Sequence, residues 1–371
     1  MFEDSITPPR LFHPLCGADP ATLIGLIRRH GMTRRSALPL SIALAVSLLK
    51  TPASLVEHGL TLARRPRGGL REAPVFILGH WRSGTTHLYN IMSKAPDFGF
   101  VSPFATALPW DFLITGRLAA PLLRRALPAH RFIDNIPVEP DSPQEDEIAL
   151  ANMTPLSFYH ALYFPERFQE VFNAGVFFDG VDAGAIERWA ARLRYFYDKL
   201  TLGAHGARLL IKNPVYTARI ALLRRIWPDA KFIHIHRNPY QVFLSMRNFY
   251  ARLFAALALG SYDHVDVDRV ILETYVRMME RFTIDWAEIP AGHCVELGYD
   301  ELQEAPLPAL ARIYETLGLS GYEAAQGSFA RYLAAVETYQ KNSYTDAGAA
   351  WAHAGERLKP FLERWSYTRP S

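Results

Sequence analysis

The sequence predicts an α/β fold in which helices flank a parallel β-sheet. A short apolar run at 74–78 precedes a glycine-containing loop and then a segment of helical periodicity, the order strand, loop, helix. Further apolar runs at 208–211, 231–235 and 293–297 alternate with segments of helical spacing. Such alternation favours a parallel sheet with helical cover. Hydrophobic residues make up 49% of the chain and charged residues 21%, which is typical of a folded globular protein.

Residues 1–70 are predicted to form a helical N-terminal extension that ends in an Arg/Pro/Gly linker. Its apolar segment at 37–49 is shorter than the roughly 20 residues that span a bilayer. Three interpretations stay open: a buried helix packed on the main domain, a helix that lies on a membrane surface through residues 34–67, or a membrane span.

Residues 71–371 are expected to form the main domain, with helices at 214–227, 239–250 and 306–317. The stretch 100–200 is rich in proline and aromatic residues, and we interpret it as a helical insertion. It is either the acceptor side of a cleft or additional helical core.

Charge and cysteine content exclude some functions. The net charge of +3 is too small to indicate a nucleic-acid partner, although a local basic cluster around an anionic ligand is compatible with it. Cys16 and Cys294 lack metal-ligand spacing and favour a reducing compartment. The start of the chain lacks the pattern of a secretory signal. We expect a cytoplasmic protein, with peripheral membrane association as an alternative.

The glycine loop at 79–86 carries the chemistry. Gly79 and Gly84 stand five positions apart, which is the frame of a loop that cradles phosphate with backbone N–H groups and a helix N-terminus. Thr85 occupies the position of the P-loop lysine, and the cation of this loop is Arg82 instead. The sheet is therefore predicted to be P-loop-like.

The later strands end in cations. Lys212 follows one strand and Arg237 the next, where a nucleoside triphosphatase needs an acid for Mg²⁺. This pattern favours a nucleotide whose charge is neutralised by arginine and lysine, with no metal.

These motifs resemble the sulfotransferase family, which uses 3′-phosphoadenosine 5′-phosphosulfate (PAPS). The similarity is greatest to its broad bacterial branch, which also resembles tyrosylprotein sulfotransferases. Segments 79–88, 209–248 and 299–319 carry the resemblance, which covers roughly residues 73–345. It implies transfer of a sulfuryl group from PAPS to a hydroxyl, giving a sulfate ester and adenosine 3′,5′-bisphosphate.

The resemblance also implies a donor site. Arg237 and Ser245 would bind the 3′-phosphate, Lys212 would lie near the transferring group, and Lys341 would close over the 3′-phosphate. A surface ion pair for Arg237, a plain helix-face position for Ser245 and a solvated strand-end Lys212 are the alternatives. The 5′-phosphosulfate would be cradled by the loop residues, with Arg82 stabilising charge on the bridging oxygen: Arg82, Ser83, Gly84, Thr85 and Thr86.

A general base must accept the proton of the acceptor hydroxyl. The acidic cluster at 141–147 offers Glu145, slightly preferred, and Glu147. As an alternative, Ser142 and Glu145 form a capping box at a helix start, with Pro143 at the first helical position. Histidines are the rival bases: His80, His87 and His160.

A PAPS-dependent sulfotransferase is therefore the leading hypothesis, acting by in-line transfer on a lipid, glycan, phenolic or protein acceptor. A P-loop kinase or NTPase with an altered loop is the second. A non-catalytic nucleotide-binding or membrane-scaffold protein is the third. The oligomeric state stays open.

Overall fold

The computed structural model describes residues 12–65, 69–116, 142–336 and 348–368. The chain divides into two compact units. The helical unit comprises Met1–Arg65, Ser102–Leu202 and Phe249–Val265, and the sheet unit comprises Pro66–Val101, Gly203–Asn248 and Asp266–Ser371. The expected division at residue 70 stays a prediction.

The sheet unit contains five parallel strands in the order β2-β3-β1-β4-β5. Four of them confirm the predicted strands, whereas β2 has only two residues, too few for a pattern in the sequence. The central β1 pairs with β3 on one side and β4 on the other. The strands are β1 (Val75–Leu78), β2 (Phe98–Gly99), β3 (Arg208–Lys212), β4 (Lys231–His236) and β5 (Cys294–Gly298).

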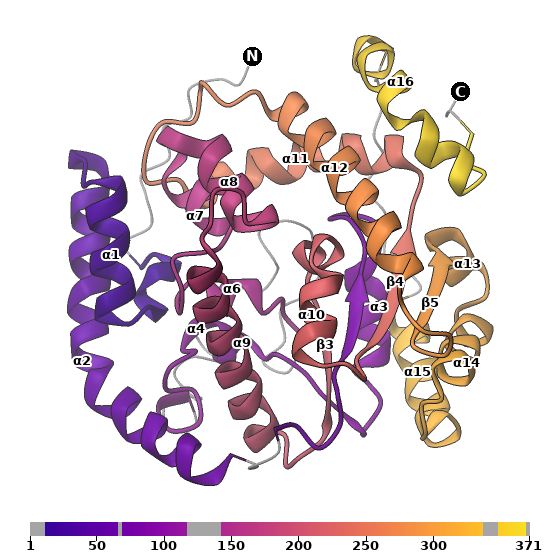
Figure 1. Ribbon diagram of the computed structural model, residues 1–371, viewed down its shortest axis with the longest axis horizontal. Helices are drawn as coiled ribbons and strands as arrows, with labels where there is room; N and C mark the ends of the chain where they lie inside the picture. Colours follow the sequence, from indigo (N-terminus) through magenta and orange to yellow (C-terminus); the bar gives the residue numbers. More distant parts are fainter. Residues whose placement is uncertain (1–11, 66–68, 117–141, 337–347, 369–371) are drawn as a thin grey trace. The chain divides into compact units, whose positions relative to one another are not determined.

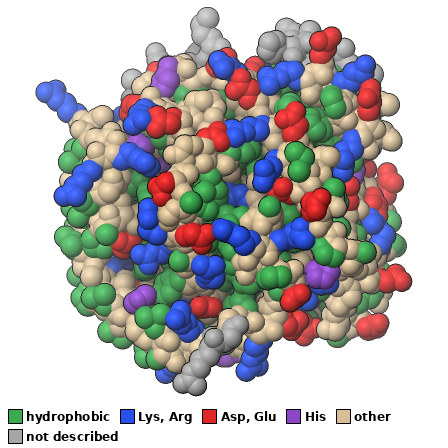
Figure 2. All heavy atoms as spheres, in the orientation of Figure 1, with side chains coloured by type: hydrophobic (Ala, Val, Ile, Leu, Met, Phe, Trp, Pro, Cys, Tyr) green, Lys and Arg blue, Asp and Glu red, His purple; other side chains and the backbone are tan. Residues whose placement is uncertain are grey.

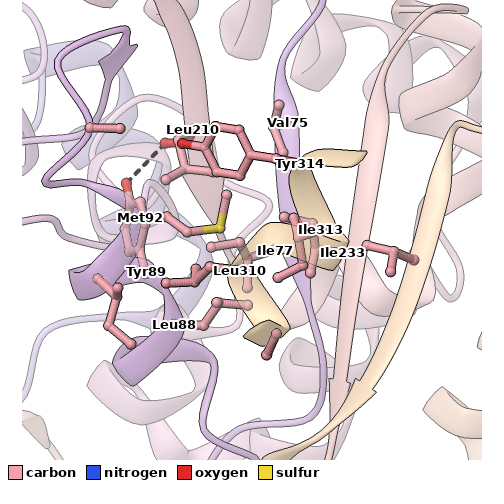
Figure 3. Close-up of a cluster of buried hydrophobic side chains, with 14 of the residues drawn as sticks. Val75, Ile77, Leu88, Tyr89, Met92, Leu210, Ile233, Leu310, Ile313 and Tyr314 are labelled. Carbon is pink, nitrogen blue, oxygen red and sulfur yellow. Dashed lines mark hydrogen bonds between the residues drawn. The ribbon is translucent and has the colours of Figure 1, made fainter. Parts of the chain in front are cut away.

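One face of the sheet is covered by α3 (Thr85–Met92), α14 (Pro306–Leu317) and α15 (Tyr322–Val336). Alternate residues of β1 point to this face, because side chains along a strand alternate between faces. Val75 and Ile77 pack there with side chains of α3 and α14 (Figure 3). The Tyr89 hydroxyl donates a hydrogen bond of 3.2 Å to the Leu210 carbonyl, which fixes α3 to β3.

The opposite face is aromatic. Phe76 of β1 packs edge-on against Tyr216 and lies beside Trp227 and Phe232, with ring centroids less than 6 Å apart. Such contacts add to the free energy of simple burial. The remaining elements of this unit include 3₁₀ helix η3 (Pro214–Ala218), α10 (Ile220–Ile226), α12 (Val267–Ala287), α13 (Tyr299–Glu304) and α16 (Gly348–Arg364). α11 (Pro239–Leu257) begins in the sheet unit.

The single helix predicted at 214–227 is wrong in one respect. The segment is a 3₁₀ turn followed by a separate short helix, interrupted at Arg219. Asn213 accepts the Val215 N–H and starts the turn, while Asp285 from α12 accepts the Ala221 N–H at 3.2 Å. A partner 64 positions away thus caps α10, and local periodicity cannot reveal it.

The helical unit consists of helices and turns in its described part. Asp19 caps α1, and Thr33 with Ser36 forms a capping box at the start of α2. α1 and α2 lie side by side (Figure 1). The elements are η1 (Pro14–Gly17), α1 (Pro20–His30), α2 (Arg34–Arg64), α4 (Pro103–Ala107), α6 (Glu147–Leu150), α7 (Tyr159–Tyr163), η2 (Pro165–Arg167), α8 (Phe168–Phe177) and α9 (Ala183–Gly203).

The helix α2 is longer than its apolar segment suggested. It runs for 31 residues through Pro39 and Pro52. Among the described residues it is the one helix whose length and composition would allow it to cross a membrane. Of its apolar stretch 22% is buried, including Leu40, Ala43 and Ser47, so α2 packs on its unit through one side, and the choice among the three interpretations stays a prediction.

A buried ion pair holds α2 to α9. Lys199 Nζ lies 2.6 Å from Glu57 Oε1, and both side chains are almost fully buried. Glu57 also accepts the backbone N–H groups of Leu113 and Ile114, and Lys199 donates to the Pro109 carbonyl. Burial lowers the pKa of Lys199 to about 8, against the opposing effect of Glu57. Because further hydrogen bonds satisfy both charges, the pair meets the condition for a tolerable buried ion pair.

Candidate functional site

The glycine loop joins β1 to α3 through a tightly constrained backbone. Gly79 has φ 141°, and a Cβ atom there would lie 2.4 Å from the Ile235 carbonyl. Gly84 has φ 105°, and a Cβ atom there would lie 2.2 Å from the Tyr299 ring. Neither position tolerates a side chain, which explains why the two glycines occur at this spacing.

The start of α3 is a site for an anion. Gly84 is its N-cap residue, and no side chain caps the first-turn N–H groups. Next to it, the Ser83 hydroxyl is buried and has no hydrogen-bond partner. Buried hydroxyls are normally hydrogen-bonded, so this one points to a missing acceptor such as a phosphate or sulfate oxygen. The loop residues therefore fit the 5′ end of a phosphorylated or sulfated nucleotide.

Three of the predicted donor-site residues lie together. Arg82 Nε donates a 2.8 Å hydrogen bond to Ser245 Oγ in α11. Arg237 Nη1 lies 3.5 Å from the Arg82 carbonyl, and its Nε donates to Gln241. Ser245 is only 2% exposed, so it faces the loop rather than solvent. The structure thus brings into one cluster three residues that were expected in the 5′ and 3′ subsites.

Lys212 supplies the cation that Thr85 does not. It leaves the end of β3, beside β1, and its Nζ donates a 3.2 Å hydrogen bond to Thr86 Oγ1 in the first turn of α3. The side chain is 2% exposed, which contradicts the alternative of a solvated strand-end lysine. A buried ammonium at a helix N-terminus increases the positive potential of the loop.

Two residues of this site were missed. Thr217 Oγ1 accepts the Gly79 N–H at 2.9 Å and so fixes the loop entrance. The Tyr299 ring packs against Gly84, and the Arg237 guanidinium lies 4.5 Å from its centroid, a cation–π contact. The position of Tyr299 directly after a strand was the one available signal, since parallel strands end at a common edge.

His80 is enclosed by protein. Its ring packs against Trp81 and Tyr275, Nδ1 lies 3.0 Å from the Trp81 carbonyl, and Nε2 is buried without a partner. Burial lowers the pKa of His80 to about 4. The imidazole is therefore neutral at pH 7 and is a weak base.

The acidic cluster lies in the helical unit, and its local structure differs from the predicted capping box. Residues 142–145 are not helical, and α6 begins at Glu147 with no side-chain cap. Tyr197 donates to Asp146 Oδ2 at 2.7 Å and fixes the chain before the helix, a tertiary contact that replaces the local cap. Asp146 and Glu147 are fully buried, whereas Glu145 is half-buried.

The other candidates have separate placements. Both ring nitrogens of His160 lie close to backbone carbonyls, at 2.8 Å from Ala151 and 3.2 Å from Pro155, so His160 supports structure in the helical unit. His87 is half-buried in the first turn of α3. Lys341 lies outside the described residues. Within the described part of the chain, no group of three acids, histidines or cysteines is arranged to hold a metal.

Comparisons with known proteins agree with this fold. The family model described as "Sulfotransferase family" matches residues 74–324. The omega-hydroxy-beta-dihydromenaquinone-9 sulfotransferase Stf3 of Mycobacterium tuberculosis is 28% identical over 303 residues, covering 81% of this chain and 76% of its own. The same protein of Mycobacterium bovis matches equally.

Solved structures show the same fold. Sulfotransferase STF9 of Mycobacterium avium superposes with a TM-score of 0.67 at 17% identity, covering 99% of both chains. Sulfotransferase STF1 of Mycobacterium tuberculosis has a TM-score of 0.60 at 16% identity, covering 91% of this chain and 90% of its own. The fold and the family match define a transferase of sulfuryl groups. The chain belongs to the sulfotransferase family.

Proposed function

We propose that the chain transfers a sulfuryl group from PAPS to a hydroxyl of its acceptor and releases adenosine 3′,5′-bisphosphate. The supporting observation is the buried, unpartnered Ser83 hydroxyl at the uncapped start of α3, with Arg82 and Lys212 at the same loop. In this anion site, protein cations would neutralise the charge of a sulfated nucleotide. PAPS supplies the activated sulfuryl group.

Each residue has a distinct role in this proposal. The first-turn N–H groups of α3, with Ser83, Thr85 and Thr86, hold the 5′ anion. Arg82 and Lys212 stabilise charge that develops on the bridging oxygen as the S–O bond breaks. The 3′-phosphate is held by Arg237, Ser245 and Lys341. Because Arg82 donates a hydrogen bond to Ser245, the proposed 5′ and 3′ subsites are linked by that bond.

Glu145 is our proposed general base. It takes the proton of the acceptor hydroxyl while the oxygen forms the new bond to sulfur, and the bridging S–O bond of PAPS breaks to release adenosine 3′,5′-bisphosphate. Asp146 and Glu147 are fully buried, and Asp146 is bonded to Tyr197, whereas Glu145 is half-buried and reaches solvent. The low pKa of His80 and the occupied nitrogens of His160 favour a carboxylate over either histidine.

We further propose a lipid acceptor and a cytoplasmic protein that meets the membrane peripherally through residues 34–67. The name of Stf3 gives an omega-hydroxy-beta-dihydromenaquinone, a menaquinone-derived lipid, as the substrate of that protein. The apolar and mostly exposed α2 supports the same class of acceptor for this chain.

The donor site is tested by a thermal-shift titration with adenosine 3′,5′-bisphosphate, ATP and GTP, each with and without Mg²⁺. A ligand at 100 times its dissociation constant adds about 2.7 kcal/mol to native stability. We expect stabilisation by the 3′,5′-bisphosphate without metal. Stabilisation only by ATP or GTP with Mg²⁺ would instead establish an altered P-loop NTPase or kinase.

A further inference from the structure

The outer surface of α1 and α2 carries apolar side chains that the donor site does not use. Among the described residues, all but one of the exposed large hydrophobic side chains lie between Phe12 and Leu62, and the exception is Ile284. Figure 2 shows hydrophobic side chains along the edge where Figure 1 places α1 and α2. Such a concentration on one surface marks an interaction site.

The exposed apolar residues of α2 recur at helical spacing along its length. Leu49 is 81% exposed and Leu55 66%. Because residues three, four and seven apart share a helix face, these side chains form one continuous band. We call this band the outer stripe: Leu38, Leu48, Leu49, Leu55, Val56, Leu60 and Leu62.

The charges of α2 lie on the opposite face. Lys50 and Glu57 are the only acidic or basic residues between Ser36 and Ala63, histidine aside. Lys50 Nζ lies 3.8 Å from Asp111, and Glu57 is buried in its pair with Lys199. A helix that faces water has the reverse arrangement, with charges outside. The outer side of α2 is therefore suited to a medium without water.

Arginines stand at both ends of the outer stripe. Arg28 and Arg29 end α1 and Arg34 begins α2, while Arg64 and Arg65 lie at the far end, and all five are exposed. An apolar band between cationic ends matches an anionic phospholipid surface, in which acyl chains meet the band and headgroups meet the arginines.

We propose that the outer stripe lies in the interface of an anionic phospholipid membrane, with α2 parallel to the surface. Membrane docking deepens the proposed function, because it names the membrane surface as the place where the enzyme meets its acceptor. The docking proposal rests on the proposed function only for the nature of that acceptor. A transmembrane α2 conflicts with Glu57, which accepts the N–H groups of Leu113 and Ile114 and pairs with Lys199. Crossing the bilayer would remove Glu57 from all these partners.

The test is vesicle flotation of the full chain. Wild-type protein is mixed with phosphatidylcholine vesicles that contain either no phosphatidylglycerol or about 30% of this anionic lipid. Each mixture is prepared at low and at high salt. We expect binding to the anionic vesicles, weakened by salt. Leu49→Glu with Leu55→Glu should reduce binding at least about tenfold, because two charges would enter the acyl region. Ile284→Glu is the matched control and should bind as wild type does.

Titration with adenosine 3′,5′-bisphosphate is run on all three proteins. If the stripe variant no longer binds vesicles but still binds the nucleotide, its loss of vesicle binding is specific to the outer stripe. If the wild-type protein does not bind the nucleotide, that result counts against the proposed function and not against membrane docking. Three results would overturn membrane docking: no flotation of wild type, full flotation of the stripe variant, or a wild-type dimer that the stripe variant dissociates. Resistance of bound protein to alkaline carbonate extraction would contradict the parallel orientation.

Discussion

Arg82 Nε donates a 2.8 Å hydrogen bond to Ser245 Oγ across 163 positions of sequence. The bond joins the glycine loop to the first turns of α11 and keeps the guanidinium at the helix start before any ligand binds. Arg82 itself has φ 69°, the left-handed region that non-glycine residues rarely adopt. The loop accepts this strained backbone at the residue assigned to charge stabilisation.

Arg82→Ala should reduce turnover far more than donor binding. Removal of one preorganised donor to a developing charge costs roughly 10²- to 10³-fold in rate. Transfer of radiolabelled sulfate from PAPS to membrane-lipid extract measures turnover, and calorimetry with adenosine 3′,5′-bisphosphate measures binding. An equal loss of both would restrict Arg82 to binding. Arg247→Ala, in the same α11 but paired with Asp268, is a suitable control.

Ser83→Ala separates ligand binding from fold stability. The hydroxyl is buried without a partner, so its removal should leave the melting temperature unchanged or raise it. Affinity for adenosine 3′,5′-bisphosphate should fall about tenfold, because a hydrogen bond to a charged group contributes roughly 1.5–3 kcal/mol. A lower melting temperature with unchanged affinity would mean that Ser83 serves the fold alone.

Gly84→Ala should destabilise the sheet unit by at least about 2 kcal/mol, since its Cβ would collide with the Tyr299 ring at a positive φ. Gly59→Ala is the contrasting change: nothing lies within 4 Å of its Cβ position in α2. That substitution should stabilise by about 0.5–1 kcal/mol. Urea unfolding of both variants, followed by tryptophan fluorescence, measures the difference. Equal midpoints would contradict the packing of Tyr299 on the loop.

Glu57→Gln should cost about 3–5 kcal/mol of unfolding free energy, because Lys199 would remain as a buried charge without its carboxylate. Adding Lys199→Met should recover much of that loss, since no unpaired charge then remains. Denaturant unfolding of the single and double variants forms the comparison. A double variant less stable than Glu57→Gln would contradict this account of the pair.

The stability of the chain should fall as the pH drops from about 6.5 to 4. Burial lowers the pKa of His160 from 6.5 to about 4, so between these values the unfolded chain binds a proton that the folded chain does not. The contribution of neutral His160 to the free energy of unfolding is fully present above pH 6.5. Up to about 3 kcal/mol of it is lost as the pH falls to 4. His160→Gln should therefore show a shallower decline from pH 7 to pH 4. Parallel curves for the two proteins would assign the acid sensitivity to other groups.

Local signals predicted much of this protein. The strands were visible as short apolar runs, and the loop as two glycines after one of them, because each depends on neighbours in sequence. The predicted strand-end cations Lys212 and Arg237 lie beside β1, as the parallel order requires. The parallel fold class itself predicts that Lys212 and Arg237 lie at the same edge of the sheet as the glycine loop.

Contacts between distant segments were not predictable. Ser142 and Glu145 have the spacing of a capping box, yet the hydrogen bond of Tyr197 to Asp146 gives that segment another course. Likewise, Asp285 splits one expected helix in two. In each case a tertiary partner outweighs a local preference that is worth about 1 kcal/mol.

The strand order β3-β1-β4 has a consequence for how the donor site can be gained or lost. Two of its cations, Lys212 and Arg237, reach the glycine loop from segments more than a hundred positions downstream, one on each side of β1. A peptide or truncated fragment that carries the loop alone would therefore retain the motif and Arg82 but lack Lys212 and Arg237. Competence to bind the nucleotide belongs to the assembled sheet, and its appearance during refolding marks the moment at which three separate stretches of chain have found one another.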